Sequence, residues 1–95
     1  MNPQALMKQY REIMKEQERI NNTTFEGENS LVKVKVNGKK EVLEVKIDKS
    51  TTLDADDLES LEDMILLAVN NAMDKVDKEV ENKLGKYTNG LPGFF

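Results

Sequence analysis

The stretch Val-Lys-Val-Lys-Val-Asn-Gly-Lys-Lys-Glu-Val-Leu-Glu-Val-Lys-Ile, residues 32–47, decides the fold. Valine alternates with lysine through residues 32–36, and apolar residues alternate with charged ones again in residues 43–47. A period of two is typical of strands that bury one face. Asn37-Gly38 lies between the two runs, and this dipeptide is a strong signal for a two-residue hairpin turn. The stretch therefore predicts an antiparallel β-hairpin.

A two-residue turn at Asn37-Gly38 also fixes the register of that hairpin. The expected pairs are Val36 with Lys39, Val34 with Glu41, and Val32 with Leu43. The apolar residues of both strands then share one face. The opposite face carries Lys33, Lys35, Lys40, Val42, Glu44 and Lys46. Residues 23–26 are β-prone and residues 27–30 are turn-forming, so we expect a third strand before the hairpin.

A first helix is predicted over residues 3–20, before the strands. Pro3 suits the first helical turn, where its missing N–H costs nothing. Every seventh residue is apolar, namely Leu6, Ile13 and Ile20. Such a narrow stripe favours packing against another helix.

A second, longer helix is predicted after the strands. Asp54, Asp56 and Asp57 open it, and we interpret them as helix-capping residues because carboxylates stabilise a helix N-terminus. The apolar stripe continues to about Leu84, and Gly85 is expected to follow the last helical residue. The methionines are interpreted as core residues: Met7, Met14, Met64 and Met73.

These elements predict an α+β fold of the form α-β-β-β-α, with a three-stranded antiparallel sheet and two long helices. Residues 1–86 form the single expected domain, and residues 87–95 a flexible C-terminal tail rich in turn residues. A helix of about 45 Å must extend beyond a sheet of about 20 Å. The overhang and the open sheet edges favour a tweezer-like homodimer.

Composition excludes several classes of function. The 95 residues contain no Cys and no His, which removes thiolate chemistry and the commonest general base and zinc ligand. We therefore expect no enzyme, cofactor, metal site or small-molecule substrate. No apolar run approaches the roughly 20 residues needed to span a bilayer, so we expect a cytoplasmic protein without a membrane partner.

Charge is distributed unevenly, although the formal net charge is −4. Residues 54–72 contain six acidic and no basic side chains. Residues 1–12 and 75–87 together contain six basic and four acidic side chains. If the helices are antiparallel, these two segments share one end, and the acidic start of the second helix lies near Arg19. The end that holds the two segments is then basic.

Two sets of basic residues could contact a phosphate backbone. The first lies on the helices and includes Lys8, Arg11, Lys83 and Lys86. The second lies on the expected polar face of the sheet: Lys33, Lys35, Lys40 and Lys46. For both sets, a solvated surface is the simpler interpretation from the residues alone.

Five segments of the chain resemble the YbaB/EbfC family of bacterial nucleoid-associated proteins. The segments are 2–9, 31–48, 61–72, 84–86 and 90–93, and they cover most of the chain in the order of the family pattern. The turn at residues 27–30 departs from that pattern, which is usually richer in glycine.

The resemblance implies the same α-β-β-β-α dimer and a function for it. Family members bind double-stranded DNA, alter its conformation, and take part in nucleoid organisation and gene expression. Their DNA contacts lie on the two helices. Carried over to the basic positions of this chain, the implied DNA-binding residues are Lys8, Arg11, Lys15, Lys78, Lys83 and Lys86. The alternative is a protein-interaction adaptor that uses the acidic helix start and the C-terminal tail.

Overall fold

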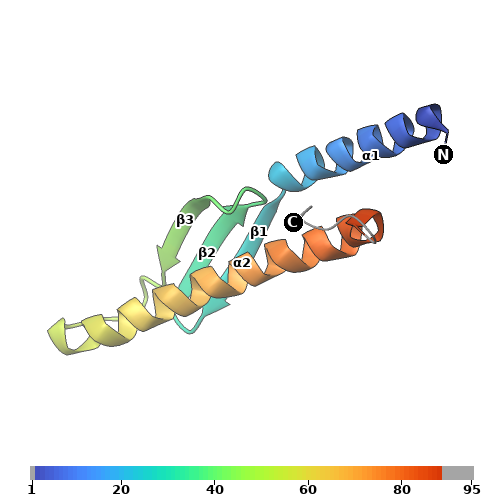
Figure 1. Cartoon of the computed structure of the whole chain (residues 1–95). Coiled ribbons are helices and arrows are strands. Elements are labelled where there is room, and N and C mark those ends of the chain that lie inside the picture. Colours follow the sequence, from blue (N-terminus) through green and yellow to red (C-terminus); the bar gives the residue numbers. More distant parts are fainter. Residues whose placement is uncertain (1, 89–95) are drawn as a thin grey trace.

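The computed structural model describes residues 2–88, which form two long helices and three strands (Figure 1). The elements are α1 (Pro3–Asn21), β1 (Thr24–Asn29), β2 (Val32–Asn37), β3 (Val42–Ile47), a 3₁₀ turn η1 (Ala55–Asp57) and α2 (Leu58–Thr88). The strands form one antiparallel sheet in the order β1-β2-β3. The predicted α+β class and its α-β-β-β-α order are confirmed.

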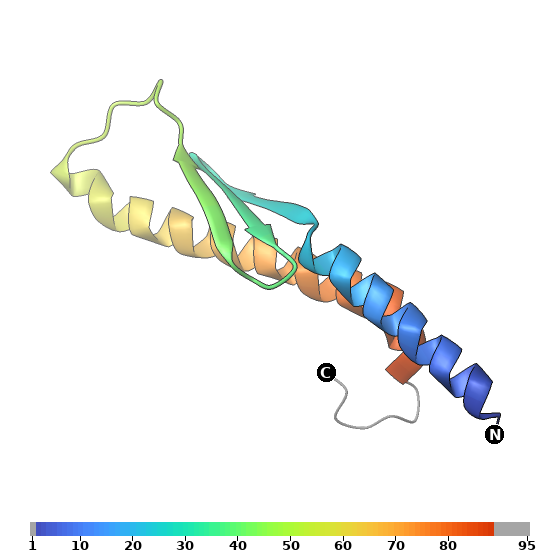
Figure 2. The same cartoon turned by 90° about the horizontal axis from the view of Figure 1, so that it is seen from above.

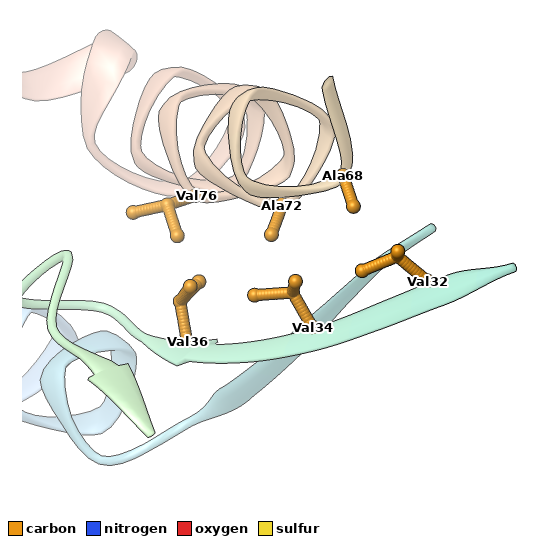
Figure 3. Close-up of a cluster of buried hydrophobic side chains, with 6 residues drawn as sticks. All are labelled: Val32, Val34, Val36, Ala68, Ala72 and Val76. Atoms are coloured by element: carbon orange, nitrogen blue, oxygen red, sulfur yellow. The ribbon is translucent and has the colours of Figure 1, made fainter. Parts of the chain in front are cut away.

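The core lies between one face of the sheet and the middle of α2 (Figure 3). Val32, Val34 and Val36 on β2 are buried, as their alternation predicts. They face Ala68, Ala72 and Val76 on α2 (Figure 3). Two of the three helix residues are alanines, and small side chains let a helix lie close to the sheet.

Gly27 allows a close approach of α2 to β1. A Cβ atom at this position would lie 2.3 Å from the carbonyl oxygen of Ala68 and 2.5 Å from the amide nitrogen of Ala72. The prediction that residues 27–30 form a turn is therefore wrong, because Gly27 lies inside β1. The turn that follows has only Ser30 and Leu31 between paired Asn29 and Val32, and Ser30 takes a φ of 51°.

The predicted register of the second hairpin is also wrong. Residues 38–40 form its loop: the Lys40 amide donates to the Asn37 carbonyl, and the Asn37 amide donates to the Glu41 carbonyl. Lys40 takes the left-handed conformation, with a φ of 63°. The observed pairs are Val36 with Val42, Lys35 with Glu44, Val34 with Val45, Lys33 with Lys46 and Val32 with Ile47, with an irregularity between Lys35 and Val36.

Gly38 explains why this loop differs from the expected turn. A Cβ atom there would lie 2.0 Å from the carbonyl oxygen of Ile20, at the end of α1. The glycine is thus required by a close approach between two segments. The left-handed residue that the loop needs is supplied by Lys40 instead.

The helices α1 and α2 pack antiparallel through a second, smaller apolar cluster. Ile13 and Ile20 of α1 and Leu84 of α2 are buried there, with Phe25, Val80 and Tyr87 packed against them. α1 begins with Pro3 in the first turn, and the side chain of Asn2 accepts a hydrogen bond from the Gln4 amide. The first turns of α1 extend past the end of α2 (Figures 1 and 2).

The sequence predicts that the second helix ends at about Leu84, but α2 continues to Thr88. Gly85 lies within the helix, because Leu84 and Tyr87 on either side of it pack into the cluster with α1. Tertiary packing here outweighs the low helix propensity of glycine. Tyr87 and Thr88 therefore belong to α2, whereas residues 89–95 of the predicted tail lie outside the described residues.

Many apolar side chains of the single chain are uncovered. α2 packs on β1 and β2, which leaves Val42, Leu43 and Val45 of β3 exposed. Leu58, Leu66 and Leu67 of α2 are exposed as well. The interpretation of all four methionines as core residues holds only for Met64 and Met73, since Met7 and Met14 on α1 are exposed.

Candidate nucleic-acid interface

Three of the six predicted DNA-contacting residues form one stripe on α1. Lys8, Arg11 and Lys15 are spaced three and four residues apart, which places them on the same face of a helix. All three are exposed. None of them forms an ion pair with another residue between 2 and 88. Their charges are therefore available to a ligand.

The other three predicted residues, Lys78, Lys83 and Lys86, lie on the second half of α2 and are exposed. Because Leu84 packs with Ile13 and Ile20, Lys83 and Lys86 lie alongside the middle of α1. The Lys86 ammonium is 5.0 Å from the centre of the Tyr87 ring. Lys78 lies two turns before Lys86, toward the sheet, and Lys8 lies in the second turn of α1. The structure brings the six residues to one half of the molecule. They are distributed along the two helices there and do not form one compact cluster.

Two other cations in the same half are neutralised by carboxylates. Arg19 contacts Glu16 at 2.6 Å and Glu79 at 3.0 Å, and hydrogen bonding to Glu79 and then Glu16 raises the pKa of its guanidinium. Lys40 contacts Asp77 at 2.6 Å. These pairs occupy two of the four acidic residues in the second half of α2, which are Asp74, Asp77, Glu79 and Glu81.

The expectation that Arg19 lies near the acidic start of α2 is wrong. α1 ends beside the second half of α2, and the start of α2 lies at the far end of the molecule (Figure 1). The partner of Arg19 on α2 is Glu79, twenty residues or more along the helix from Asp54 to Glu59. The sequence did not indicate this offset, since it depends on where α2 crosses the sheet.

The acidic start of α2 is a capping structure. The Asp54 side chain accepts a hydrogen bond from the Asp56 amide, and Asp54 and Asp57 form a reciprocal capping box. The predicted capping role of these residues is confirmed. With its long axis of 64 Å, the molecule separates this acidic end from the candidate cations. The alternative function as an adaptor that uses this patch and the tail stays a prediction.

The outer face of the sheet carries a mixed array of charges. Lys35 lies between Glu26, at 3.9 Å, and Glu44, at 3.7 Å. The Lys46 ammonium lies 3.5 Å from the Glu44 carboxylate. A shallow hollow on this face is lined by lysine and glutamate side chains together. The predicted register placed Lys40 on this face. In the structure Lys40 instead contacts Asp77 on α2. The sheet is therefore a weaker candidate for phosphate contact than the helices.

In the part of the chain from residue 2 to residue 88, no helix is apolar enough over a sufficient length to cross a bilayer. Over the same residues, no group of acidic side chains is gathered in a way that could hold a metal ion.

Comparison with known proteins places these features in a class of small DNA-binding proteins. The sequence model that defines the YbaB/EbfC DNA-binding family matches residues 1–91 of this chain. A nucleoid-associated protein of Ligilactobacillus salivarius is 38% identical over 98% of this chain and 94% of its own length. One of Lactococcus lactis subsp. lactis is 42% identical over 97% and 98%. The chain belongs to the YbaB/EbfC DNA-binding family of nucleoid-associated proteins.

The fold is shared with a solved structure of low sequence identity. The crystal structure of an uncharacterized protein from Helicobacter pylori aligns with a TM-score of 0.72 at 20% identity, and the alignment covers 92% of this chain and 97% of that one. At this level of identity the similarity concerns the fold alone.

Proposed function

We propose that this protein binds double-stranded DNA in the nucleoid as a homodimer, through the exposed cations of α1 and α2. The observation that carries the proposal is the contrast between paired and unpaired cations in one half of the molecule. Arg19 and Lys40 have carboxylate partners, whereas Lys8, Arg11, Lys15, Lys78, Lys83 and Lys86 have no ion-pair partner within residues 2–88. Family membership supports DNA as the ligand.

The proposed mechanism is contact with phosphates by two symmetry-related sets of cations. A net charge of −4 does not prevent this, because screening acts over about 8 Å at physiological ionic strength, so that a phosphate responds to the local charge. The two sets of cations on one dimer bind phosphates at two positions along a duplex. Binding at two fixed positions alters the conformation of the DNA between them. Effects on nucleoid organisation and gene expression follow from that change.

The salt dependence of binding tests this mechanism. If about 4–6 phosphates are neutralised, log K falls with log salt concentration at a slope of about −4 to −5, and nonspecific dissociation constants reach about 10⁻⁴ to 10⁻⁶ M near physiological salt. Fluorescence anisotropy with a labelled duplex, at salt concentrations from about 25 to 200 mM, measures the slope. Absence of binding at the lowest salt concentration would overturn the proposal.

The proposed dimer uses the uncovered edge of the sheet. β3 is an edge strand with exposed Val42, Leu43 and Val45, and an edge of this kind invites pairing with another strand. A twofold contact between two β3 strands joins the sheets and leaves the helices projecting from the centre. This arrangement agrees with the tweezer-like dimer expected from the sequence.

Sedimentation tests the dimer directly. We expect a species of about twice 10.8 kDa at micromolar concentration. Changing Leu43 and Val45 together to Lys places four like charges in the proposed contact, so the variant is expected to sediment as a monomer. The matched control is Lys33→Gln, on the outer face of β2, which leaves the dimer unchanged. A wild-type monomer at this concentration contradicts the proposal.

A further inference from the structure

α1 carries an apolar stripe that no other element within residues 2–88 covers. Met7, Tyr10 and Met14 are spaced three and four residues apart and lie on one face of the helix. Their exposed fractions are 57%, 61% and 51%, although the next face of the same helix buries Ile13 and Ile20 against α2. Part of the stripe lies on the turns of α1 that extend past α2 (Figures 1 and 2).

Cations border this stripe directly. Arg11 lines two shallow hollows on α1: one with Tyr10 and Met14, the other with Met7 and Lys8. Lys15 lines the first hollow as well. A single helix thus presents an apolar stripe and an adjoining stripe of positive charge, neither of which has an ion-pair or core partner in residues 2–88.

The charges decide between two possible occupants of the apolar stripe. In an antiparallel twofold contact between two α1 helices, the stripe would face itself, and the cations beside it would meet the cations of the other copy. Like charges that meet across a contact cost free energy. A duplex instead offers phosphates to the cations and bases to the apolar side chains. The charge pattern therefore favours DNA.

We propose that the outer turns of α1 enter the major groove, with Lys8, Arg11 and Lys15 on phosphates and Met7, Tyr10 and Met14 against thymine methyl groups. This inference rests on the proposed function as a binder of double-stranded DNA. The major groove admits an α-helix and exposes the thymine C5-methyl group, which is read by apolar contact. The protein is therefore expected to prefer A·T-rich DNA because of apolar contacts with thymine methyl groups, independently of its phosphate contacts.

Two duplexes that differ only in methyl groups test the proposal. One is an A·T-rich duplex of about 20 base pairs, and the other has every thymine replaced by deoxyuridine, so that charge and base pairing stay the same. The full-length protein is expected to bind the deoxyuridine duplex about threefold to fourfold more weakly for each methyl contacted. Equal affinity for the two duplexes overturns the proposal, and no binding to either one overturns the proposed function as well.

A variant with Met7, Tyr10 and Met14 all changed to Gln assigns the effect to the stripe. Gln is polar and a good helix former, so α1 is expected to keep its helicity, which circular dichroism checks. We expect this variant to bind both duplexes equally, whereas the matched control Gln9→Ala keeps the preference for thymine. If the Gln variant changes the sedimenting mass of the protein, a second copy covers the stripe and the proposal is wrong.

Discussion

Changing Gly27 to Ala is expected to lower the free energy of unfolding by more than about 3 kcal/mol, at the upper end of what overpacking costs. The new Cβ atom would lie 2.3 Å and 2.5 Å from two backbone atoms of α2. Backbone atoms cannot rotate away as a flexible side chain does, so α2 must separate from β1. This separation would also open the contact between the valines of β2 and the alanines of α2.

Thermal unfolding measures this effect. In a chain of this size, each kcal/mol shifts the midpoint by about 4–8 °C, so Gly27→Ala is expected to melt more than about 12 °C below the wild type. The matched control is Gly85→Ala, where the nearest heavy atom to the new Cβ is the Glu81 Cγ at 3.9 Å. Ala is favoured over Gly inside a helix by about 0.8–1 kcal/mol, so this variant should melt a few degrees higher. A Gly27→Ala protein that melts like the wild type would contradict the close contact between α2 and β1.

The two glycines of the sheet region explain which parts of the fold the sequence could predict. The valine alternation in β2 determines a buried face whatever the rest of the chain does, and that prediction is confirmed. A glycine, in contrast, signals either a turn or a close approach of two backbones. Gly27 and Gly38 both serve close approaches, which depend on where α2 and the end of α1 lie. Their interpretation as turn residues gave the wrong first turn and the wrong register in the second hairpin.

The same distinction applies to the candidate interface: some of its features follow from local sequence, and others depend on tertiary packing. Helical spacing alone places Lys8, Arg11 and Lys15 on one face, because that property is local to α1. The partners of Arg19 and Lys40 are set by packing between distant segments, since both pair with residues in the second half of α2. The exposure of Met7 and Met14 also depends on tertiary packing, because α2 packs on the neighbouring face of α1, which carries Ile13 and Ile20. Sequence reasoning could identify the cations, and it set Arg19 apart as neutralised by the second helix, but it could not identify the residues that pair with Arg19 and Lys40.

Charge reversal of Lys8, Arg11, Lys83 and Lys86 to Glu is expected to abolish DNA binding and to leave the dimer intact. Each lost phosphate contact removes about one unit from the salt slope, so four reversals per chain leave little dependence on salt. The new carboxylates repel phosphates in addition. We expect affinity at low salt to fall by about 100-fold or more.

A second quadruple variant separates the local charge from the net charge. Changing Lys33, Lys39, Lys46 and Lys49 to Glu alters the net charge by the same amount, at exposed positions in the sheet region and the segment after β3. Because screening acts over about 8 Å, this variant is expected to bind DNA much more strongly than the variant of the helices. Gel shifts at low salt compare the two, and sedimentation establishes that each remains a dimer. Equal losses in both variants would mean that net charge governs binding, and unchanged binding after reversal of the helix cations would show that the DNA contacts lie elsewhere.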